Sequence, residues 1–153
     1  MPYLSGIRTP HEYPNIEGSI FGLNLNTNKK NIAWTIIEGI SFIFKECQDI
    51  LINNNYSFPK EIVLIGGGAK NIQWAKILSS LLNVKILVPE NQDYVASIGA
   101  IRLAINNLTM SKYKPIFPES NVIDVDLRLR EILLERFDRY IEHQKLLFNL
   151  NNC

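Results

Sequence analysis

The sequence predicts an α/β fold with a short parallel sheet, flanking helices and a further helix at its C-terminal end. A continuous apolar run at 62–65 ends in three glycines and a helical pattern, which is typical of a buried parallel strand, a tight turn and a helix. A second short apolar run, at 84–88, follows that helix, so the two runs form a β-α-β unit. Long stretches with apolar residues at helical spacing flank this unit on both sides.

The composition bounds the class of protein. A length of 153 residues is usual for one domain, and 46% hydrophobic with 20% charged residues is typical of a globular protein. The formal net charge of +1 predicts no general attraction to nucleic acid or to an anionic membrane. No apolar stretch approaches the length of a membrane span, and Cys47 and Cys153 suggest neither a disulfide nor a metal site. We therefore expect free thiols and a cytoplasmic protein.

The first long helix should follow an irregular segment, residues 1–26, that is rich in proline and glycine. Thr27 is a candidate N-cap, and asparagines at 53–55 should end the helix. We expect one face to be buried because its residues are mostly apolar at helical spacing: Ala33, Ile36, Ile37, Ile40, Ile43, Phe44, Cys47, Ile50 and Leu51. The face opposite should be mostly polar: Glu38, Ser41, Lys45, Glu46 and Asp49.

The glycine turn after the first strand, Gly66-Gly67-Gly68, has two readings. Glycine tolerates positive φ and allows a close approach to the backbone, and a helix N-terminus favours anions, so the turn suits a phosphate or a nucleotide. It can equally be a tight corner. Asn71 is placed to cap the next helix, which carries Trp74, Ile77, Leu78, Leu81 and Leu82 on one side.

The rest of the chain predicts two more helices. The helix over about 93–105 has a face of small residues that should pack closely, and a proline-containing linker should span 114–121. From about Asp126 a last helix places Leu129, Ile132, Leu133, Phe137, Tyr140 and Leu147 along one side. Arg128, Arg130, Glu131, Glu135, Arg139 and Glu142 should form a solvated face. His11 and His143 are expected to be exposed, and no set of catalytic or metal-binding residues stands out.

Several spaced motifs occur in a characteristic order along the chain. They are Tyr3-Leu4-Ser5-Gly6-Ile7-Arg8-Thr9-Pro10, Gly18-Ser19-Ile20-Phe21-Gly22-Leu23, Asn31-Ile32 through Glu38-Gly39, Gly66-Gly67-Gly68-Ala69-Lys70-Asn71 with Trp74, and Gly99-Ala100. Together they resemble the C-terminal half of the FGGY carbohydrate kinases, most closely the xylulokinases, over residues 2 to about 107. The C-terminal helix is also similar to that of the family.

The resemblance implies part of an actin-like ATPase (ribonuclease H-like) fold, namely its C-terminal lobe. Residues 1–110 would be a portion of that lobe without its first strands, and 111–153 its linker and C-terminal packing helix. The resemblance further implies ATP as cofactor, with Mg²⁺ in a complete enzyme, and transfer of the γ-phosphate to a sugar hydroxyl. The backbone of 66–69 would lie against the adenosine of the nucleotide, and Lys70, Asn71 and Gln73 would lie at the rim of its pocket.

The sequence departs from the family pattern at a few positions. Ile7 stands where relatives usually carry glutamate, which could leave Arg8 unpaired, although a structural ion pair is the favoured role for Arg8. Ser79 and Ser80 stand where relatives have Ala-Asp, and Asn71 replaces a serine. These departures leave the fold intact and suggest relaxed constraint.

The resemblance places the sugar site and the catalytic aspartate in an N-terminal lobe that this sequence does not contain. We therefore expect some strand edges and apolar helix faces to lack partners. One hypothesis is the nucleotide-binding part of a sugar kinase, active only with an N-terminal half on another chain. The other is a non-catalytic remnant or nucleotide-binding module. A dinucleotide-binding domain is disfavoured because Asn71 stands where its third glycine would fall.

Overall fold

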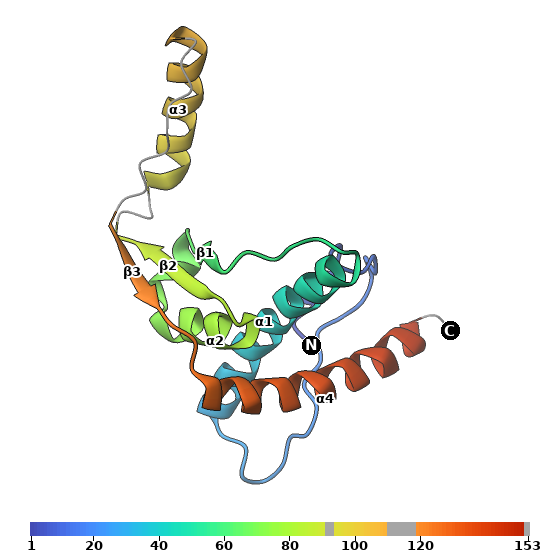
Figure 1. Ribbon diagram of the computed structural model, residues 1–153. Coiled ribbons are helices and arrows are strands. Elements are labelled where there is room, and N and C mark those ends of the chain that lie inside the picture. The colour runs from blue at the N-terminus through green and yellow to red at the C-terminus, as the bar shows by residue number, and fades with distance from the viewer. Residues whose placement is uncertain (91–93, 110–118, 152–153) are drawn as a thin grey trace.

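The computed structural model describes residues 1–90, 94–109 and 119–151. The elements run in the order α1 (Lys29–Asn53), β1 (Glu61–Val63), the 3-10 turn η1 (Gly67–Lys70), α2 (Ile72–Leu82), β2 (Lys85–Pro89), α3 (Val95–Thr109), β3 (Ser120–Ile123) and α4 (Leu127–Asn151). Helices α1, α2 and α4 lie together beside a small sheet, and α3 stands away from it (Figure 1). No helix in these described ranges combines the length and the apolar character needed to cross a membrane.

The sheet has the strand order β1-β2-β3. Strands β1 and β2 are parallel, with Ile62 opposite Ile86, as the β-α-β pattern predicts. Strand β3 is antiparallel to β2, with Ile86 opposite Ile123, so the sheet is mixed. The sequence interpretation missed β3 and placed its first residues in a linker. The remainder of that linker, 114–118, lies outside the described residues.

Strand β1 is shorter and more exposed than its apolar sequence predicts. It ends at Val63 instead of continuing to residue 65, and the side chains of Val63 and Ile65 are 37% and 49% exposed. The expectation of a strand buried on both faces was therefore wrong for β1. The exposed residues alternate along the strand and so share one face, whereas Ile62 and Leu64 on the other face pack against the cluster with α2, so the described residues cover only one face of β1.

Helix α2 joins two apolar clusters. Leu78 and Leu82 pack with Val84, Ile86 and Val88 in one cluster between α2 and the sheet. The other cluster lies between α1, α2, α4 and the N-terminal segment and consists of Tyr3, Ile7, Ile16, Phe42, Ile77, Leu81, Leu133, Phe137 and Tyr140. Its members from α4 confirm most of the predicted apolar side of the last helix, although Ile132 is 43% exposed.

Hydrogen bonds also close the region where α2, β3 and α4 meet. The Ser79 hydroxyl contacts the carbonyls of Val84 and Ile123, and the Ser80 hydroxyl accepts from the Asp126 N–H. Arg130 donates to the carbonyls of Ser80 and Leu81 at 3.1 and 2.9 Å, so it binds the C-terminal end of α2. The placement of Arg130 on a solvated face was wrong. Both serines have structural partners, which argues against relaxed constraint at these two positions.

Helix α1 presents its faces in the opposite way from the prediction. Its expected apolar face is largely exposed, with Ile36 at 47%, Ile40 at 38% and Phe44 at 46%. Its expected polar face is the buried one, where Glu38 and Glu46 are each 6% exposed. The periodicity identified the apolar residues correctly, but α2 and α4 cover the other side of the helix. The N-cap of α1 is Asn28 and not the predicted Thr27. The Asn28 side chain accepts from the N–H groups of Lys30 and Asn31.

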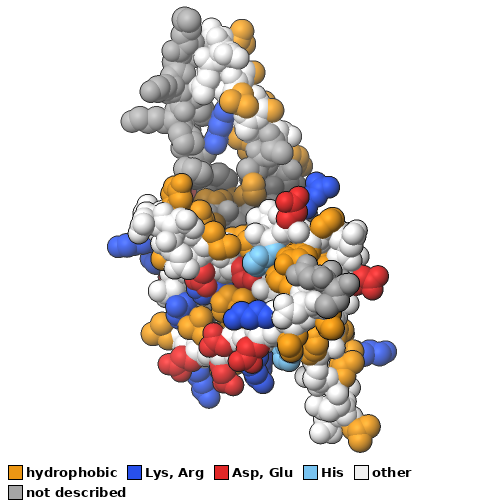
Figure 2. All heavy atoms as spheres, turned by 90° about the vertical axis from the view of Figure 1, so that its right-hand side faces the viewer, with side chains coloured by type: hydrophobic (Ala, Val, Ile, Leu, Met, Phe, Trp, Pro, Cys, Tyr) orange, Lys and Arg blue, Asp and Glu red, His pale blue; other side chains and the backbone are white. Residues whose placement is uncertain are grey.

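Helix α3 does not pack as predicted. A Cβ atom on Gly99 would meet nothing within 4 Å, and Ile101, Leu103 and Leu108 are 58%, 72% and 84% exposed. Figure 2 shows hydrophobic side chains on the surface at the top of the view, where α3 lies. The close packing predicted for the small residues of α3 is therefore not seen at Gly99 within the described part of the chain.

Candidate functional site

The glycine turn is a compact backbone structure between β1 and α2. Gly66 has a φ of +88°, a conformation that residues with a side chain rarely adopt. The shape of the turn therefore requires glycine at this position. The Ala69 N–H donates to the Gly66 carbonyl and the Asn71 N–H to the Gly68 carbonyl, each at 3.0 Å. These bonds form η1 and lead directly into α2.

The remaining two glycines have different structural reasons. A Cβ on Gly68 would lie 2.2 Å from the ring of Trp74, so Gly68 is needed for the indole to pack. A Cβ on Gly67 would meet nothing within 4 Å, and Gly67 has no positive φ. Neither conformation nor packing within the described residues explains the glycine at 67. This position is therefore the open part of the turn, where another molecule can approach the backbone.

The other predicted site residues divide between structural and exposed positions. Ala69 is fully buried in the cluster between α2 and the sheet, so its side chain serves the packing of the turn. The Asn71 side chain accepts from the N–H groups of Gln73 and Trp74 at 3.1 and 3.2 Å, which confirms its predicted role as the cap of α2. Lys70 and Gln73 are exposed beside the turn.

Trp74 connects the turn to α1. Its indole N–H donates to the Ser41 hydroxyl at 3.0 Å, and the ring of Phe44 lies edge-on at 6.2 Å between centroids. Ser41 itself donates to the Ile37 carbonyl within α1 at 2.8 Å. The position of the indole over Gly68 therefore depends on both α1 and α2.

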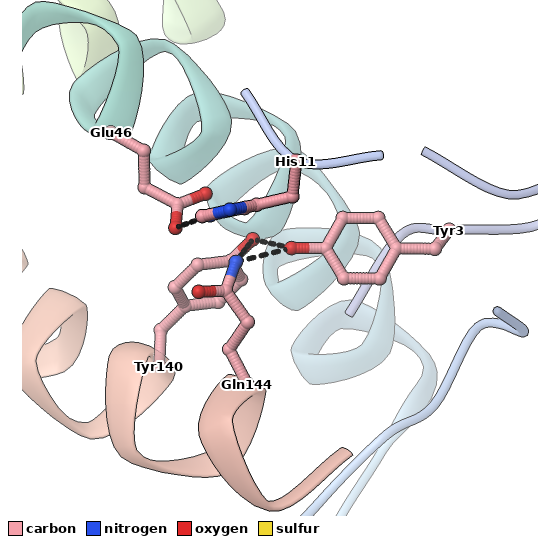
Figure 3. A network of polar contacts seen from close by, with 5 residues as sticks. All are labelled: Tyr3, His11, Glu46, Tyr140 and Gln144. Atoms are coloured by element: carbon pink, nitrogen blue, oxygen red, sulfur yellow. Dashed lines mark hydrogen bonds and ion pairs between the residues drawn. The ribbon is translucent and has the colours of Figure 1, made fainter. Parts of the chain in front are cut away.

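A buried polar network joins the N-terminal segment, α1 and α4 (Figure 3). The hydroxyls of Tyr3 and Tyr140 lie 2.5 Å apart, and the Gln144 amide donates to the Tyr3 hydroxyl at 2.6 Å. The ring Nε2 of His11 lies 3.2 Å from Glu46 Oε1, while Glu46 Oε2 has no partner among the described residues. The sequence interpretation missed this network because it placed Glu46 on a polar outer face and His11 in an exposed loop.

Burial dominates the electrostatics of the network. It raises the pKa of the Glu46 carboxyl, although the neighbouring side chains of Gln144 and His11 oppose the rise. Burial likewise raises the pKa values of Tyr3 and Tyr140 above the ordinary value for tyrosine. Both hydroxyls therefore stay protonated at neutral pH and serve as hydrogen-bonding groups. The arrangement stabilises the packing of three segments and lies away from the glycine turn.

A hollow of about 740 Å³ opens between the N-terminal segment, α1 and α4. On its wall, Glu38 Oε1 accepts from the Trp34 indole N–H and from Arg136, each at 2.5 Å. The ring of His143 stacks on Phe21 at 4.6 Å, so His143 is partly covered instead of exposed as predicted. The charged groups of this hollow already have partners, and the glycine turn does not line it.

Two further expectations concern charged groups and thiols. Arg8 is exposed and forms no ion pair with any residue that the structure describes, as expected if Ile7 in place of glutamate leaves it unpaired, so its structural role stays a prediction. Cys47 is a free thiol whose pKa is raised mainly by burial, and Cys153 lies outside the described residues. Within the described ranges, no three His, Cys, Asp or Glu side chains gather as they would around a metal ion.

Comparison with known proteins gives one consistent result. A sequence model of the C-terminal domain of the FGGY family of carbohydrate kinases matches residues 1–108. Among curated relatives, a xylulose kinase from Staphylococcus xylosus is 44% identical over 103 residues, which cover 67% of this chain and 21% of the relative. A xylulose kinase from Escherichia coli strain K12 is 32% identical over 104 residues, with 68% and 21% covered. The match spans about a fifth of the length of these relatives and lies in their C-terminal part.

Solved structures agree with this match. A xyloylose kinase from Brucella ovis superposes with a TM-score of 0.88 at 28% identity over 98% of this chain and 32% of its own. A ligand-bound xylulose kinase from Lactobacillus acidophilus gives a TM-score of 0.81 at 26% identity over 95% and 30%. The predicted actin-like ATPase lobe is therefore confirmed as the fold.

Proposed function

Because the chain belongs to the FGGY family of carbohydrate kinases, of which it matches the C-terminal domain, we propose that it is the nucleotide-binding part of an ATP-dependent sugar kinase. In the complete enzyme the γ-phosphate of ATP would pass to a hydroxyl of the sugar. The observation that carries this proposal is Gly67, since neither its conformation nor its packing against the described residues requires a glycine. Since the xylulose kinases share this part of the chain, a ketopentose such as D-xylulose is the proposed sugar.

The residues of the turn would act in different ways on the nucleotide. Gly66 sets the direction of the backbone through its positive φ, and the open space at Gly67 admits the nucleotide. Gly68 and Ala69 support the turn by packing against Trp74 and the sheet cluster. Asn71 and Gln73, with Lys70, would line the rim of the nucleotide pocket, where Asn71 keeps its function as the cap of α2.

The groups that complete the reaction would come from outside this chain. Phosphoryl transfer needs an oriented acceptor, a metal ion that neutralises the phosphates and a residue that positions the nucleophile. The described residues do not fit a Mg²⁺ site, since they contain no cluster of metal-binding side chains. We propose that an N-terminal kinase portion supplies the sugar site and the metal ligands. We also propose that residues 1–110 and 111–153 belong to one lobe, because α4 packs on α2. Cytoplasmic location remains a prediction.

A second candidate is a nucleotide-binding module without catalysis of its own. The two candidates share the glycine turn and differ only in whether phosphoryl transfer follows when the rest of a kinase is present.

Calorimetric titration with ATP tests the shared feature. We expect the parent chain to bind ATP, and we expect Gly67→Ala to weaken binding at least about tenfold because the added methyl group occupies the open side of the turn. Gly99→Ala is the matched control, since a Cβ there also meets nothing within 4 Å and φ is also ordinary. Absence of heat with the folded parent chain, or equal affinities of parent and Gly67→Ala, would contradict nucleotide binding at the turn.

An activity assay separates the two candidates. The chain is mixed with an N-terminal kinase portion and assayed for phosphorylation of D-xylulose by ATP. Turnover that requires both polypeptides supports the kinase part, whereas ATP binding without turnover supports the non-catalytic module.

A further inference from the structure

The hollow between the N-terminal segment, α1 and α4 has the dimensions of a small-molecule site. Its volume of about 740 Å³ falls within the range of roughly 300–1,000 Å³ that is usual for ligand pockets. A second hollow of about 340 Å³ shares Phe21, Gly22 and Asn31 with it, so the two adjoin each other. Both lie on the part of the molecule away from α3 (Figure 1). The side chains of the walls decide which class of ligand fits there.

Helix α4 turns three basic side chains toward the larger hollow. Arg136, Arg139 and His143 line it, and their spacing of three and four residues places them on one face of the helix. Among the described lining residues, Glu38 is the one acidic side chain. Even with His143 neutral, two arginines therefore face a single carboxylate. The hollow has a surplus of positive charge.

The partners of these arginines leave donors for a ligand. Arg136 donates to Glu38 Oε1, which also accepts from the Trp34 indole, while a guanidinium carries five N–H donors. Arg139 lies 3.7 Å from the Glu135 carboxylate, but these two side chains are 62% and 78% exposed. An ion pair so exposed to water is weak, so an anion in the hollow can compete for Arg139.

Helix α1 adds neutral hydrogen-bond donors to the walls. Asn31 Oδ1 accepts from the Asn28 N–H at 3.0 Å, so the amide NH₂ of Asn31 is the group left for a ligand. The Thr35 hydroxyl, one turn further along α1, lines both hollows and can also donate. Because the walls offer more donors than acceptors, they suit the oxygen atoms of a phosphate group, which arginine binds through two parallel N–H groups.

Aromatic rings lie beside these polar groups. The Phe21 side chain is 44% exposed, and its ring stacks on the His143 ring with 4.6 Å between centroids and 15° between planes. Trp34 is 36% exposed, and its bond to Glu38 holds the indole in the wall. Such rings offer flat apolar surface, so they favour a ligand that carries a flat ring next to its charged group.

We propose that this hollow is a binding site for a small organic phosphate with a flat ring. The phosphate group contacts Arg136 and Arg139, and the ring of the ligand lies against Phe21 and Trp34. None of the described lining residues belongs to the glycine turn or to its rim. The site is therefore separate from the proposed nucleotide pocket, and the inference does not rest on the proposed function.

Titration with phenyl phosphate, followed by NMR of the indole N–H signals, tests the proposal. The sequence contains two tryptophans, and Trp34→Phe identifies which of the two signals belongs to Trp34. We expect the probe to shift the Trp34 signal and to leave the signal of Trp74, beside the glycine turn, in place. Inorganic phosphate and benzoate should each bind at least about tenfold more weakly, because the first lacks the ring and the second carries a lower charge.

Two variants separate the charged contact from the aromatic one. Arg139→Gln should weaken the binding of phenyl phosphate at least about tenfold, because it removes a cation from the hollow. Arg128→Gln is its matched control, since Arg128 is an exposed arginine of the same helix that does not line the hollow. Phe21→Leu keeps an apolar side chain without the ring, so it should weaken phenyl phosphate and leave inorganic phosphate unchanged. Circular dichroism verifies that each variant stays folded, which is expected because the altered side chains are exposed.

The results that would overturn the proposal are distinct. A Trp34 signal that stays in place with the folded parent chain is one, and equal binding by Arg139→Gln and Arg128→Gln is another. A shift of the Trp74 signal alone would move the phosphate to the glycine turn, and benzoate bound as tightly as phenyl phosphate would make the ligand a carboxylate. Failure of ATP to bind at the glycine turn would sink the proposed function and leave this inference standing.

Discussion

The regions of the molecule on the two sides of α2 differ in how completely they are covered. Toward β3 and α4, Leu81 is fully buried, Ser79 bonds to two carbonyls and Arg130 binds the end of the helix. Toward α1 and the edge of β1, Ile40 and Val63 are 38% and 37% exposed, and backbone groups of β1 point to solvent. The chain is therefore a completed packing unit on one side and an open one on the other. The difference shows that apolar periodicity identifies the residues to be buried, and not which segment will cover them.

The largest expected loss of stability comes from opening a cavity on the closed side, the region of α2, β3 and α4. Leu81→Ala should lower the free energy of unfolding by about 2–5 kcal/mol, because Leu81 is fully buried. Ile40→Ala on the open side should lower it by less than about 1 kcal/mol, since much of that side chain already contacts water. Urea denaturation of both variants measures the contrast, and equal losses would contradict the division into closed and open sides.

Removing Arg130 tests the hydrogen bonds of the closed side. Arg130→Met should cost about 1.5–3 kcal/mol, because the carbonyls of Ser80 and Leu81 lose a charged donor while the aliphatic packing is kept. Arg128→Met is the control at an exposed position of the same helix and should be nearly neutral. A similar loss in both variants would mean that charge on α4, and not the contact with α2, determines the effect.

Removing the Asn71 cap at the start of α2 should have a smaller effect on stability. Asn71→Ala should destabilise the chain by about 1 kcal/mol because two N–H groups at the start of α2 lose their acceptor. Asn71→Ser should retain most of the stability, since serine is also a good N-cap. Thermal unfolding of the three proteins checks this order, and a serine variant as unstable as the alanine variant would contradict it.

The smallest effect concerns Glu46 on the inner side of α1. Because burial raises the pKa of Glu46, the folded state holds a proton more tightly than the unfolded state. Its contribution to stability is therefore present at low pH and is lost as the pH rises from the ordinary value of 4.5 through the higher folded pKa. Other carboxylates titrate as well, so the relevant quantity is the difference between the parent chain and Glu46→Gln.

That difference should change with pH in one direction. Relative to the parent chain, Glu46→Gln should become more stable as the pH rises from 4.5 toward 7, measured by urea denaturation at a series of pH values. A difference that stays constant, or one that favours the parent chain at neutral pH, would show that the carboxyl is not destabilised by burial.

Local signals in the sequence predicted local structure well. Asn71 caps α2 as its position before the helical pattern indicated, and the glycines form the turn between β1 and α2. The parallel pairing of β1 and β2 followed from the β-α-β pattern. These features depend on residues that are close in the sequence, so the pattern contains the information.

Features that depend on distant segments were not predictable in this way. Strand β3 is short and contains Ser120 and Asn121, so it carries a weak strand pattern until its pairing with β2 is known. The spacing of residues along α4 does not reveal that Arg130 reaches the end of α2. In the same way, the spacing along α1 does not reveal that Glu46 faces the N-terminal segment. For the candidate site, the motif located the turn, but only the structure separates the packing requirement at Gly68 from the open space at Gly67.

The contact of Trp74 with Gly68 links the glycine turn to the packing of α1. The same indole is held by Ser41 and Phe44 of α1, so a shift of α1 displaces the ring that supports the turn. Nucleotide binding at the turn and the position of α1 should therefore be thermodynamically linked. If a bound nucleotide favours one position of α1, that position must favour nucleotide binding by the same factor. Through this one side chain, the packing of α1 and the proposed recognition of a nucleotide become a single coupled equilibrium.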